Sequence, residues 1–395
     1  MLTDRNACNL LAMANDAKLK IAYVLPQLNR AGTQKQVVQL ASAMADRGYS
    51  VKVVLLEEGR AMAAEISEKV EVVSCGFKAS PRSPATVVAL FRLFRHLKKF
   101  RPDIIHSYLI WPNIWSGLVA SSIPSAVFIT SRRNLAWYKE ENAWLRRLED
   151  LTNIRASAIT VNAKAVLADT ERWEPRARGK IRLIYNGIQA DRTDPQKPTA
   201  NDAETRTNNG ATAEDVVLVS VANLHPYKGH ADLIEAVSLL KERGRKVVLW
   251  ILGEDRGSKQ ALLDKVGQLG LEKQVMLLGR RDDVGAFLST ADIGLLCPSH
   301  NEGLSNSLLE YMNSGLPAVV TDVGGNAECV ADGESGFVIP IERPDLVADC
   351  IDRMIESPSL RETFGAEAVA RVRRLFQSEK MVDEHVQLYS ELMSQ

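Results

Sequence analysis

The sequence has 395 residues, of which 46% are hydrophobic and 25% charged, and its 49 basic and 49 acidic side chains cancel to zero formal net charge. A chain of this length exceeds one ordinary hydrophobic core, so two domains are expected. The charge balance gives no electrostatic basis for nucleic-acid binding. The five scattered cysteines lack the spacing of a disulfide framework or a zinc site, which is typical of a cytoplasmic protein.

Short runs of valine, isoleucine and leucine alternate with helical patterns along the whole chain. In the first half they predict buried strands at residues 21–26, 51–56, 70–75, 103–109, 126–130, 158–163 and 181–187. In the second half they predict strands at 216–224, 247–254, 275–279, 293–299, 318–325 and 336–340. Near-continuous apolar strands separated by helices are typical of parallel sheets covered on both faces. Because so many strands exceed one sheet, the pattern predicts an α/β fold with two doubly wound, Rossmann-like domains.

A polar segment separates the two halves. Residues 189–212 contain almost no large apolar side chain and are predicted to be a linker or insertion. The boundaries expected from this are a first domain at 1–188 and a second domain at 213–375. Residues 376–395 show amphipathic spacing and predict a final helix.

Residues 301–317, NEGLSNSLLEYMNSGLP, follow a predicted buried strand and carry two glutamates. Glu302 falls in the loop after the strand, Ser305 is a good helix N-cap, and Glu310 falls inside the helix. Free backbone N–H groups around Gly303 form an anion site suited to phosphate, and carboxylates beside it would bind hydroxyl groups. The stretch therefore suits a sugar nucleotide. The alternative is a solvated helix with two ordinary surface glutamates.

Two further loops support a phosphate ligand. Lys228 and Gly229 lie between a strand and a helix, where lysine can neutralise a diphosphate; a solvated loop lysine is the alternative. Gly32 and Thr33 lie in another loop between a strand and an amphipathic helix. Neither a dinucleotide-binding glycine fingerprint nor a Walker-type phosphate loop is present in the sequence.

These stretches, in this order, resemble the retaining glycosyltransferases of family 4. The resemblance covers nearly the whole chain and is carried by the Gly32 loop, PDIIHSYL, IRLIYNGI, VANLHPYKGH, ILGE, PSHNEGLSNSLLEYMNSGLPAVVTDVGG and DGESGFVI. It implies the GT-B fold, in which two Rossmann-like domains face each other across a cleft. The first domain would lie on the acceptor side, the second would bind the nucleotide sugar, and residues 376–395 would cross back to the first.

The resemblance also implies roles for single residues. Glu302 is similar to the first family glutamate, which contacts the donor sugar near the reacting carbon, and Glu310 to the second, which holds the ribose. Lys228 is similar to the diphosphate lysine, so Glu302 and Lys228 are the expected catalytic residues. Further donor contacts are implied for Gly32, Thr33, Asn223, Arg280, Gly303, Leu304 and Ser305.

Two positions depart from the family pattern. Asn223 stands where members often carry an arginine, so one positive phosphate partner is missing and Arg280 or Arg281 is a candidate substitute. Tyr108 stands where many members have a second histidine, which leaves the sugar preference open. His106 and Tyr108 are candidates for contact with the sugar or acceptor, although a structural strand-end histidine is the alternative for His106.

The predicted chemistry needs neither a cofactor nor a metal. Lys228 and helix N-termini are expected to stabilise the leaving nucleoside diphosphate. The pair Asp282–Asp283 is interpreted as a helix start, with a metal-binding acidic pair as the alternative. The expected donor is a nucleotide sugar, UDP-linked in preference to GDP-linked.

The expected acceptor is a glycan or a lipid-linked glycan in cell-surface polysaccharide biosynthesis. Residues 87–103 combine apolar and basic side chains, which indicates either a helix covering the sheet or contact with anionic lipid at the inner face of the membrane. The aromatics Trp111, Trp115, Trp137 and Tyr138 are candidates for an acceptor cleft, with a packing role as the alternative. The alternatives to a transferase are a nucleotide-sugar epimerase, a phosphorylase, or a non-catalytic subunit that binds sugar nucleotides.

Overall fold

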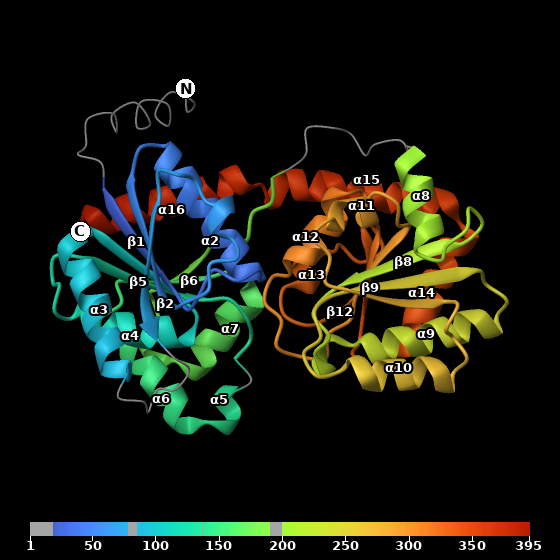
Figure 1. Ribbon diagram of the computed structural model, residues 1–395, viewed down its shortest axis with the longest axis horizontal. Coiled ribbons are helices and arrows are strands. Elements are labelled where there is room, and N and C mark those ends of the chain that lie inside the picture. Colours follow the sequence, from blue (N-terminus) through green and yellow to red (C-terminus); the bar gives the residue numbers. More distant parts are fainter. Residues whose placement is uncertain (1–18, 78–84, 137, 190–199) are drawn as a thin grey trace.

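The computed structural model describes residues 19–77, 85–136, 138–189 and 200–395. Two lobes lie side by side, each built around a parallel sheet with helices on both faces (Figure 1). The chain passes once from the first lobe to the second, and its C-terminal end lies against the first lobe again. Trp137 lies outside the described residues.

The first sheet has seven parallel strands in the order β3-β2-β1-β4-β5-β6-β7. In chain order they are β1 (Lys20–Leu25), β2 (Ser50–Glu57), β3 (Glu71–Phe77), β4 (Ile104–Tyr108), β5 (Val127–Arg132), β6 (Ala158–Val161) and β7 (Ile181–Leu183). In β1 every residue except Lys20 is buried, as expected for a strand with helices on both faces of its sheet.

The helical segments of the first lobe connect these strands. They are α2 (Gly32–Asp46), η2 (Ala63–Glu65), α3 (Ala85–Phe100), α4 (Ile110–Ala120), α5 (Tyr138–Glu141), α6 (Ala143–Thr152), α7 (Lys164–Trp173) and η3 (Pro175–Ala177). Helix α2 follows β1 directly and faces the second lobe (Figure 1).

The second sheet has six parallel strands in the order β10-β9-β8-β11-β12-β13. They are β8 (Val216–Val221), β9 (Val247–Leu252), β10 (Val275–Gly279), β11 (Ile293–Leu296), β12 (Ala318–Thr321) and β13 (Gly336–Ile339). Its helical segments are η4 (Pro226–Lys228), α9 (His230–Glu242), α10 (Lys259–Gln268), α11 (Val284–Leu288), α12 (Asn306–Asn313), α13 (Asn326–Cys329), α14 (Pro344–Glu356) and α15 (Pro358–Leu375). The α/β fold with two doubly wound sheets is therefore confirmed, and each predicted strand overlaps one of these strands.

The last helix, α16 (Ser378–Met393), belongs by its packing to the first lobe. It contacts α2, and its buried residues Met381 and Tyr389 share a core with Ile21 of β1 and Val37 of α2. The last helix thus returns to the lobe that contains β1, and the two lobes are joined both near residue 189 and at the start of α16.

The domain limits given above stay predictions, but the structure adds one feature to the segment 189–212. Its second half contains α8 (Ala200–Asn208), whose Arg206 pairs with Asp292 at 2.6 Å. Helix α8 also contacts α11. Among the described residues, no helix is both long and apolar enough to cross a membrane.

Candidate functional site

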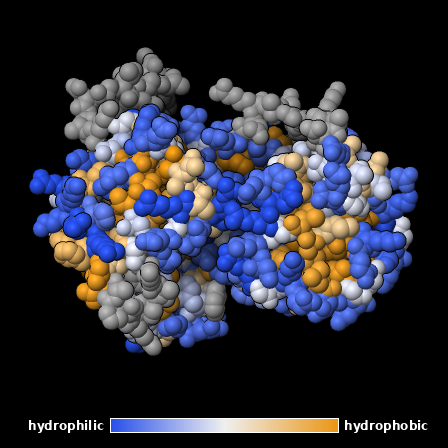
Figure 2. Space-filling model, viewed as in Figure 1, coloured by the Kyte–Doolittle hydropathy of each residue, from blue (hydrophilic) through white to orange (hydrophobic). Residues whose placement is uncertain are grey.

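A cavity of about 2290 Å³ lies between the two lobes. It opens at the carboxyl ends of the strands, where both sheets reverse their strand order, at β1/β4 and β8/β11. Such switch points are the usual ligand sites of open α/β sheets because the loops there diverge to opposite faces. In Figure 2 the surface between the lobes is mainly hydrophilic, as a cleft for a charged ligand requires.

Most of the residues predicted for the donor site line this cavity. They are Gly32, Thr33, Asn223, Lys228, Arg280, Glu302, Leu304, Ser305 and Glu310. Gly303 is not among the lining residues, although its neighbours on both sides are. His106 and Tyr108 do not line the cavity either.

Lys228 and Glu302 form an ion pair across the switch point of the second sheet. Lys228 ends η4 after β8, Glu302 follows β11, and their Nζ and Oε2 atoms are 2.6 Å apart with the side chains only 16% and 11% exposed. Burial acts to lower the pKa of Lys228, but attraction to Glu302 and the hydrogen bond between them raise it overall. The lysine therefore stays positive, as stabilisation of a leaving diphosphate would require.

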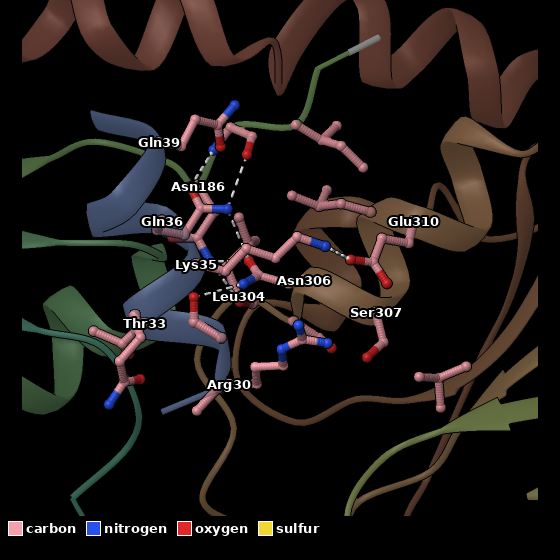
Figure 3. A pocket seen from close by; sticks show the side chains of 18 of the residues that line it. Arg30, Thr33, Lys35, Gln36, Gln39, Asn186, Leu304, Asn306, Ser307 and Glu310 are labelled. Carbon is pink, nitrogen blue, oxygen red and sulfur yellow. Dashed lines mark hydrogen bonds and ion pairs between the residues drawn. The ribbon is translucent and has the colours of Figure 1, made fainter. Parts of the chain in front are cut away.

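Helix α12 presents its N-terminus and Glu310 to the cavity. Ser305 occupies the N-cap position as predicted, but its side chain makes no capping hydrogen bond. The first N–H groups of a helix lack intrahelical partners and favour an anion. Glu310, on the same helix, forms an ion pair with Lys35 of α2, so the two lobes touch here (Figure 3).

Close backbone packing positions the loop before α12. A Cβ atom added to Gly303 would lie 2.0 Å from the carbonyl oxygen of Arg133 in the first lobe. Only glycine allows this approach. Leu135 also donates its N–H to the carbonyl of Glu302 at 3.2 Å. The loop that carries Glu302 is therefore seated directly on the first lobe.

Side-chain amides continue this contact between the lobes. Asn306 of α12 donates to the carbonyl of Gly32 at 2.8 Å. Asn186 donates to the carbonyl of Leu304 at 2.9 Å, and Gln36 of α2 donates to the side-chain oxygen of Asn306 at 3.2 Å. Figure 3 shows these groups converging between α2 and the start of α12.

The segment after β10 carries charges that already have partners. Arg281 pairs with Asp283 through two hydrogen bonds of 2.9 and 2.8 Å, while Arg280 is 3.7 Å from Asp282. Arg30 of the first lobe also pairs with Asp282. Asp283 does precede α11, which agrees with the interpretation as a helix start.

Asn223 follows β8 and its side-chain oxygen accepts a hydrogen bond of 3.1 Å from the N–H of Glu254. The side-chain amide of Asn223 therefore links the loop after β8 to the loop after β9. It lines the cavity but brings no positive charge to it.

His106 and Tyr108 lie in a buried polar network beneath the cleft. His106 bonds to Tyr389 of α16 at 2.8 Å and to Ser131 at 2.8 Å, and the hydroxyl of Tyr108 is 3.3 Å from His106. Burial holds the pKa of His106 well below its usual value, and the neighbouring His385 and Arg133 add to the effect. This network agrees with the structural interpretation of His106; contact of either residue with a sugar or acceptor stays a prediction.

Sequence reasoning missed the first-lobe residues Arg30, Lys35, Arg133 and Asn186, which all line the cavity. For Lys35 a signal existed, because it lies one helical turn after Gly32 and so shares its side of α2. For Arg133 and Asn186 only their place just after strands β5 and β7 pointed to the cleft. Within the described ranges, no group of three or more His, Cys, Asp or Glu side chains could hold a metal ion.

Comparison with known families gives two matches, one for each lobe. The glycosyl transferase 4-like domain matches residues 31–187, and the glycosyl transferases group 1 family matches residues 201–371. Two Rossmann-like lobes that face each other across a cleft define the GT-B fold. Together these findings place the chain among the GT-B glycosyltransferases.

Individual relatives agree with this placement. The chain is similar to EpsD of Bacillus subtilis (strain 168), named as a glycosyltransferase, with 26% identity over 339 residues, covering 82% of this chain and 85% of the relative. It is also similar to the lipopolysaccharide core biosynthesis glycosyltransferase LpsE of Rhizobium meliloti (strain 1021), at 24% identity, covering 90% and 95%. Anabaena HepE, solved with UDP and glucose and with UDP-glucose, shares the fold at a TM-score of 0.82 and 20% identity, covering 94% and 100%.

Proposed function

We propose that this chain is a retaining glycosyltransferase of family 4 that transfers a sugar from a nucleotide-sugar donor, UDP-linked in preference to GDP-linked. The observation that carries the proposal is the convergence of Lys228, Glu302, Glu310 and the start of α12 on one cavity between two Rossmann-like lobes. A cation and free amides suit the diphosphate, and the two carboxylates suit hydroxyls on either side of it.

The preference for a UDP-linked sugar is supported by the fold neighbour HepE, whose structure was solved with UDP-glucose. In this chain Glu310 is proposed to accept hydrogen bonds from the ribose, and Arg280, which lines the same cavity, is proposed to meet the base. Gly32 and Thr33 would meet the diphosphate from the opposite lobe, because they line the other wall of the cavity.

Transfer breaks the bond between the anomeric carbon and the diphosphate oxygen, and charge develops on both fragments. Lys228 and the amides at the start of α12 would stabilise the departing diphosphate without a metal. Glu302 would hold the sugar beside the anomeric carbon. The acceptor hydroxyl forms the new C–O bond on the same face, and its proton passes to the departing phosphate oxygen, which leaves as the nucleoside diphosphate.

A donor panel tests the activity. Purified protein should slowly hydrolyse one UDP-sugar in preference to the others and to GDP-sugars, and excess EDTA should leave this rate largely intact. Loss in EDTA, restored by Mg²⁺ or Mn²⁺, would contradict the metal-free part. Binding of donor without any hydrolysis would favour the non-catalytic alternative, and a changed sugar released as free nucleotide sugar would favour the epimerase.

Two variants test the division of roles within the site. Glu310→Ala should weaken binding of UDP and of the UDP-sugar alike, because the ribose contact is common to both. Glu302→Ala should lower turnover while leaving the affinity for free UDP nearly unchanged. Equal loss of UDP affinity in both variants would contradict these assignments.

The acceptor is proposed to be a glycan or lipid-linked glycan of cell-surface polysaccharide synthesis, which the lipopolysaccharide relative LpsE supports. A second cavity of about 360 Å³ in the first lobe shares Leu109, Arg133 and Asn134 with the main cleft. Trp111 and Tyr138 line it. An aromatic face and adjoining polar groups suit a sugar ring, so this cavity is the proposed acceptor end of the cleft.

A membrane contact is proposed at the outer side of the first lobe, with a cytoplasmic location. The helices α3, α4 and α6 pack in succession, and together with the turn after α6 they carry large apolar side chains exposed by 47% to 69%: Val87, Val88, Phe91, Leu118, Trp144, Leu151 and Ile154. Their exposed charges are basic: Arg92, Arg95, Lys98, Lys99 and Arg147. The two acids of α6, Glu149 and Asp150, are buried, and α3 and α4 contain none.

Apolar and basic side chains on one face suit the interface of an anionic bilayer. Orange and deep blue residues adjoin at the left edge of Figure 2, where Figure 1 places α3. Sedimentation with phosphatidylglycerol vesicles should retain the protein, and Phe91→Ser should reduce this. Leu263→Ser, an exposed apolar residue of α10 in the second lobe, is the matched control. Equal retention by phosphatidylcholine alone, or no effect of Phe91→Ser, would refute the contact.

A further inference from the structure

The positive side chains that line the cleft are mostly neutralised by carboxylates. Ion pairs join Arg30 to Glu65 and Asp282, Lys35 to Glu310, Arg47 to Asp383, Lys228 to Glu302, Arg280 to Asp282, and Arg281 to Asp283. In the absence of ligand the cleft therefore offers little uncompensated positive charge from these groups.

Arg133 differs from all of them. It follows β5, lines the cleft and is only 8% exposed, yet it pairs with no carboxylate in the part of the chain that the structure describes. Its Nη2 donates to the side-chain oxygen of Asn186, its Nε is buried without a partner, and its guanidinium lies 5.8 Å from the ring centre of Tyr108.

The preceding residue shows what a structural arginine looks like in this lobe. Arg132 is equally buried, but it pairs with Glu149 at 3.1 Å and with Glu174 at 2.6 Å. Two carboxylates thus neutralise Arg132, whereas no carboxylate of the described residues neutralises Arg133. A buried charge without a counter-charge costs several kcal/mol unless a partner arrives.

The guanidinium of Arg133 lies beside the start of α12. Asn186, to which it donates, itself donates to the carbonyl of Leu304 at 2.9 Å and to Asn306 at 2.8 Å. These two residues flank the N-cap of α12, whose free amides also favour an anion. The pKa of Arg133 is lowered by burial, and Tyr108 offsets that effect only in part.

We propose that Arg133 binds the distal phosphate of the donor's diphosphate, the one that joins the sugar, at the floor of the cleft. The phosphate would provide the counter-charge for Arg133 that the described carboxylates do not provide. Arg133 would in turn provide the positive charge that is missing at Asn223. Guanidinium–phosphate hydrogen bonds are charge-assisted and specific in geometry. The inference rests on the proposed function, because it takes a nucleoside diphosphate as the ligand.

Calorimetric titration with UMP and with UDP tests the contact, since only UDP carries the distal phosphate. Arg133→Gln should lose about 10-fold to 100-fold in UDP affinity, the size of a charge-assisted hydrogen bond, while UMP affinity changes little. Arg47→Gln is the matched control, because Arg47 lines the same cavity but pairs with Asp383 at 2.6 Å. Arg47→Gln should bind UMP and UDP with the affinities of the wild type.

An unchanged preference for UDP over UMP in Arg133→Gln would overturn the proposal. A loss confined to UDP-glucuronate would assign the arginine to a sugar carboxylate instead, and a raised acceptor KM alone would assign it to the acceptor. If Arg133→Gln does not fold, Arg133→Lys carries the same test, since lysine keeps the charge without the planar fork. If the wild type bound neither UDP nor GDP, the proposed function itself would fail.

Discussion

The ion pair between Lys228 and Glu302 allows the structural and ligand-binding roles of these residues to be separated. With a 2.6 Å separation and side chains 16% and 11% exposed, the pair is close to fully buried. Removing one partner of a buried pair costs about 3–5 kcal/mol, because the other charge is left uncompensated. The remaining exposure admits some water, so we expect a cost just below this range, about 2–3 kcal/mol.

Together with the wild type, Lys228→Met, Glu302→Gln and the double variant form a double-mutant cycle. Each single variant should lower the melting temperature of the second domain by roughly 5–10 °C when no ligand is present, following the usual scaling for a domain of this size. The double variant should recover about 1–3 kcal/mol relative to the sum of the singles, because no unpaired charge remains. All three should lose UDP-sugar turnover, since the recovery of stability restores neither functional group.

Scanning calorimetry of the ligand-free proteins is the measurement. Lys246→Met is the matched control, because Lys246 pairs with Glu214 on the surface of the same lobe and both are largely exposed. The control should melt as the wild type does. If the double variant lost the full sum of the two single losses, the pair would not be coupled and the argument from burial would be wrong.

Three further outcomes follow from the geometry. Gly229→Ala should lower both stability and donor affinity, because φ is +74° and a Cβ would lie 1.8 Å from the carbonyl of Cys297; wild-type melting would contradict this. Lys35→Met should raise UDP affinity up to about fivefold, because Lys35 competes with the ligand for Glu310 and this partly exposed ion pair is worth under about 1 kcal/mol. A lowered affinity would instead indicate that Lys35 contacts the ligand. Burial lowers the pKa of His385 from 6.5 to about 4, so the folded protein favours the neutral imidazole. The free energy of unfolding should therefore fall as the pH drops from 6.5 to 4, by up to roughly 3 kcal/mol. Urea unfolding should show a smaller difference in this free energy between pH 7 and pH 5 for His385→Asn than for the wild type.

The sequence by itself determined the architecture. Runs such as IAYVLP and VVLWIL are apolar at almost every position, and only a parallel sheet with helices on both faces buries such a strand completely. The segment around Glu302 could likewise be placed, because a strand, a glycine-containing loop, an N-cap and a helix are local signals. The structure has α12 starting at Asn306 after Ser305, as predicted.

Only the tertiary structure decided which groups meet across the cleft. Lys35 pairs with Glu310, and Asn306 donates to the carbonyl of Gly32, over separations in sequence of 275 and 274 residues. Nothing local marks these pairs, because they depend on how two sheets built from separate halves of the chain are oriented. The same holds for His106, whose partner Tyr389 arrives on α16 from the far end of the chain. Strand and helix periodicity reports burial within one segment, whereas the charge balance of a cleft is set by contacts between segments.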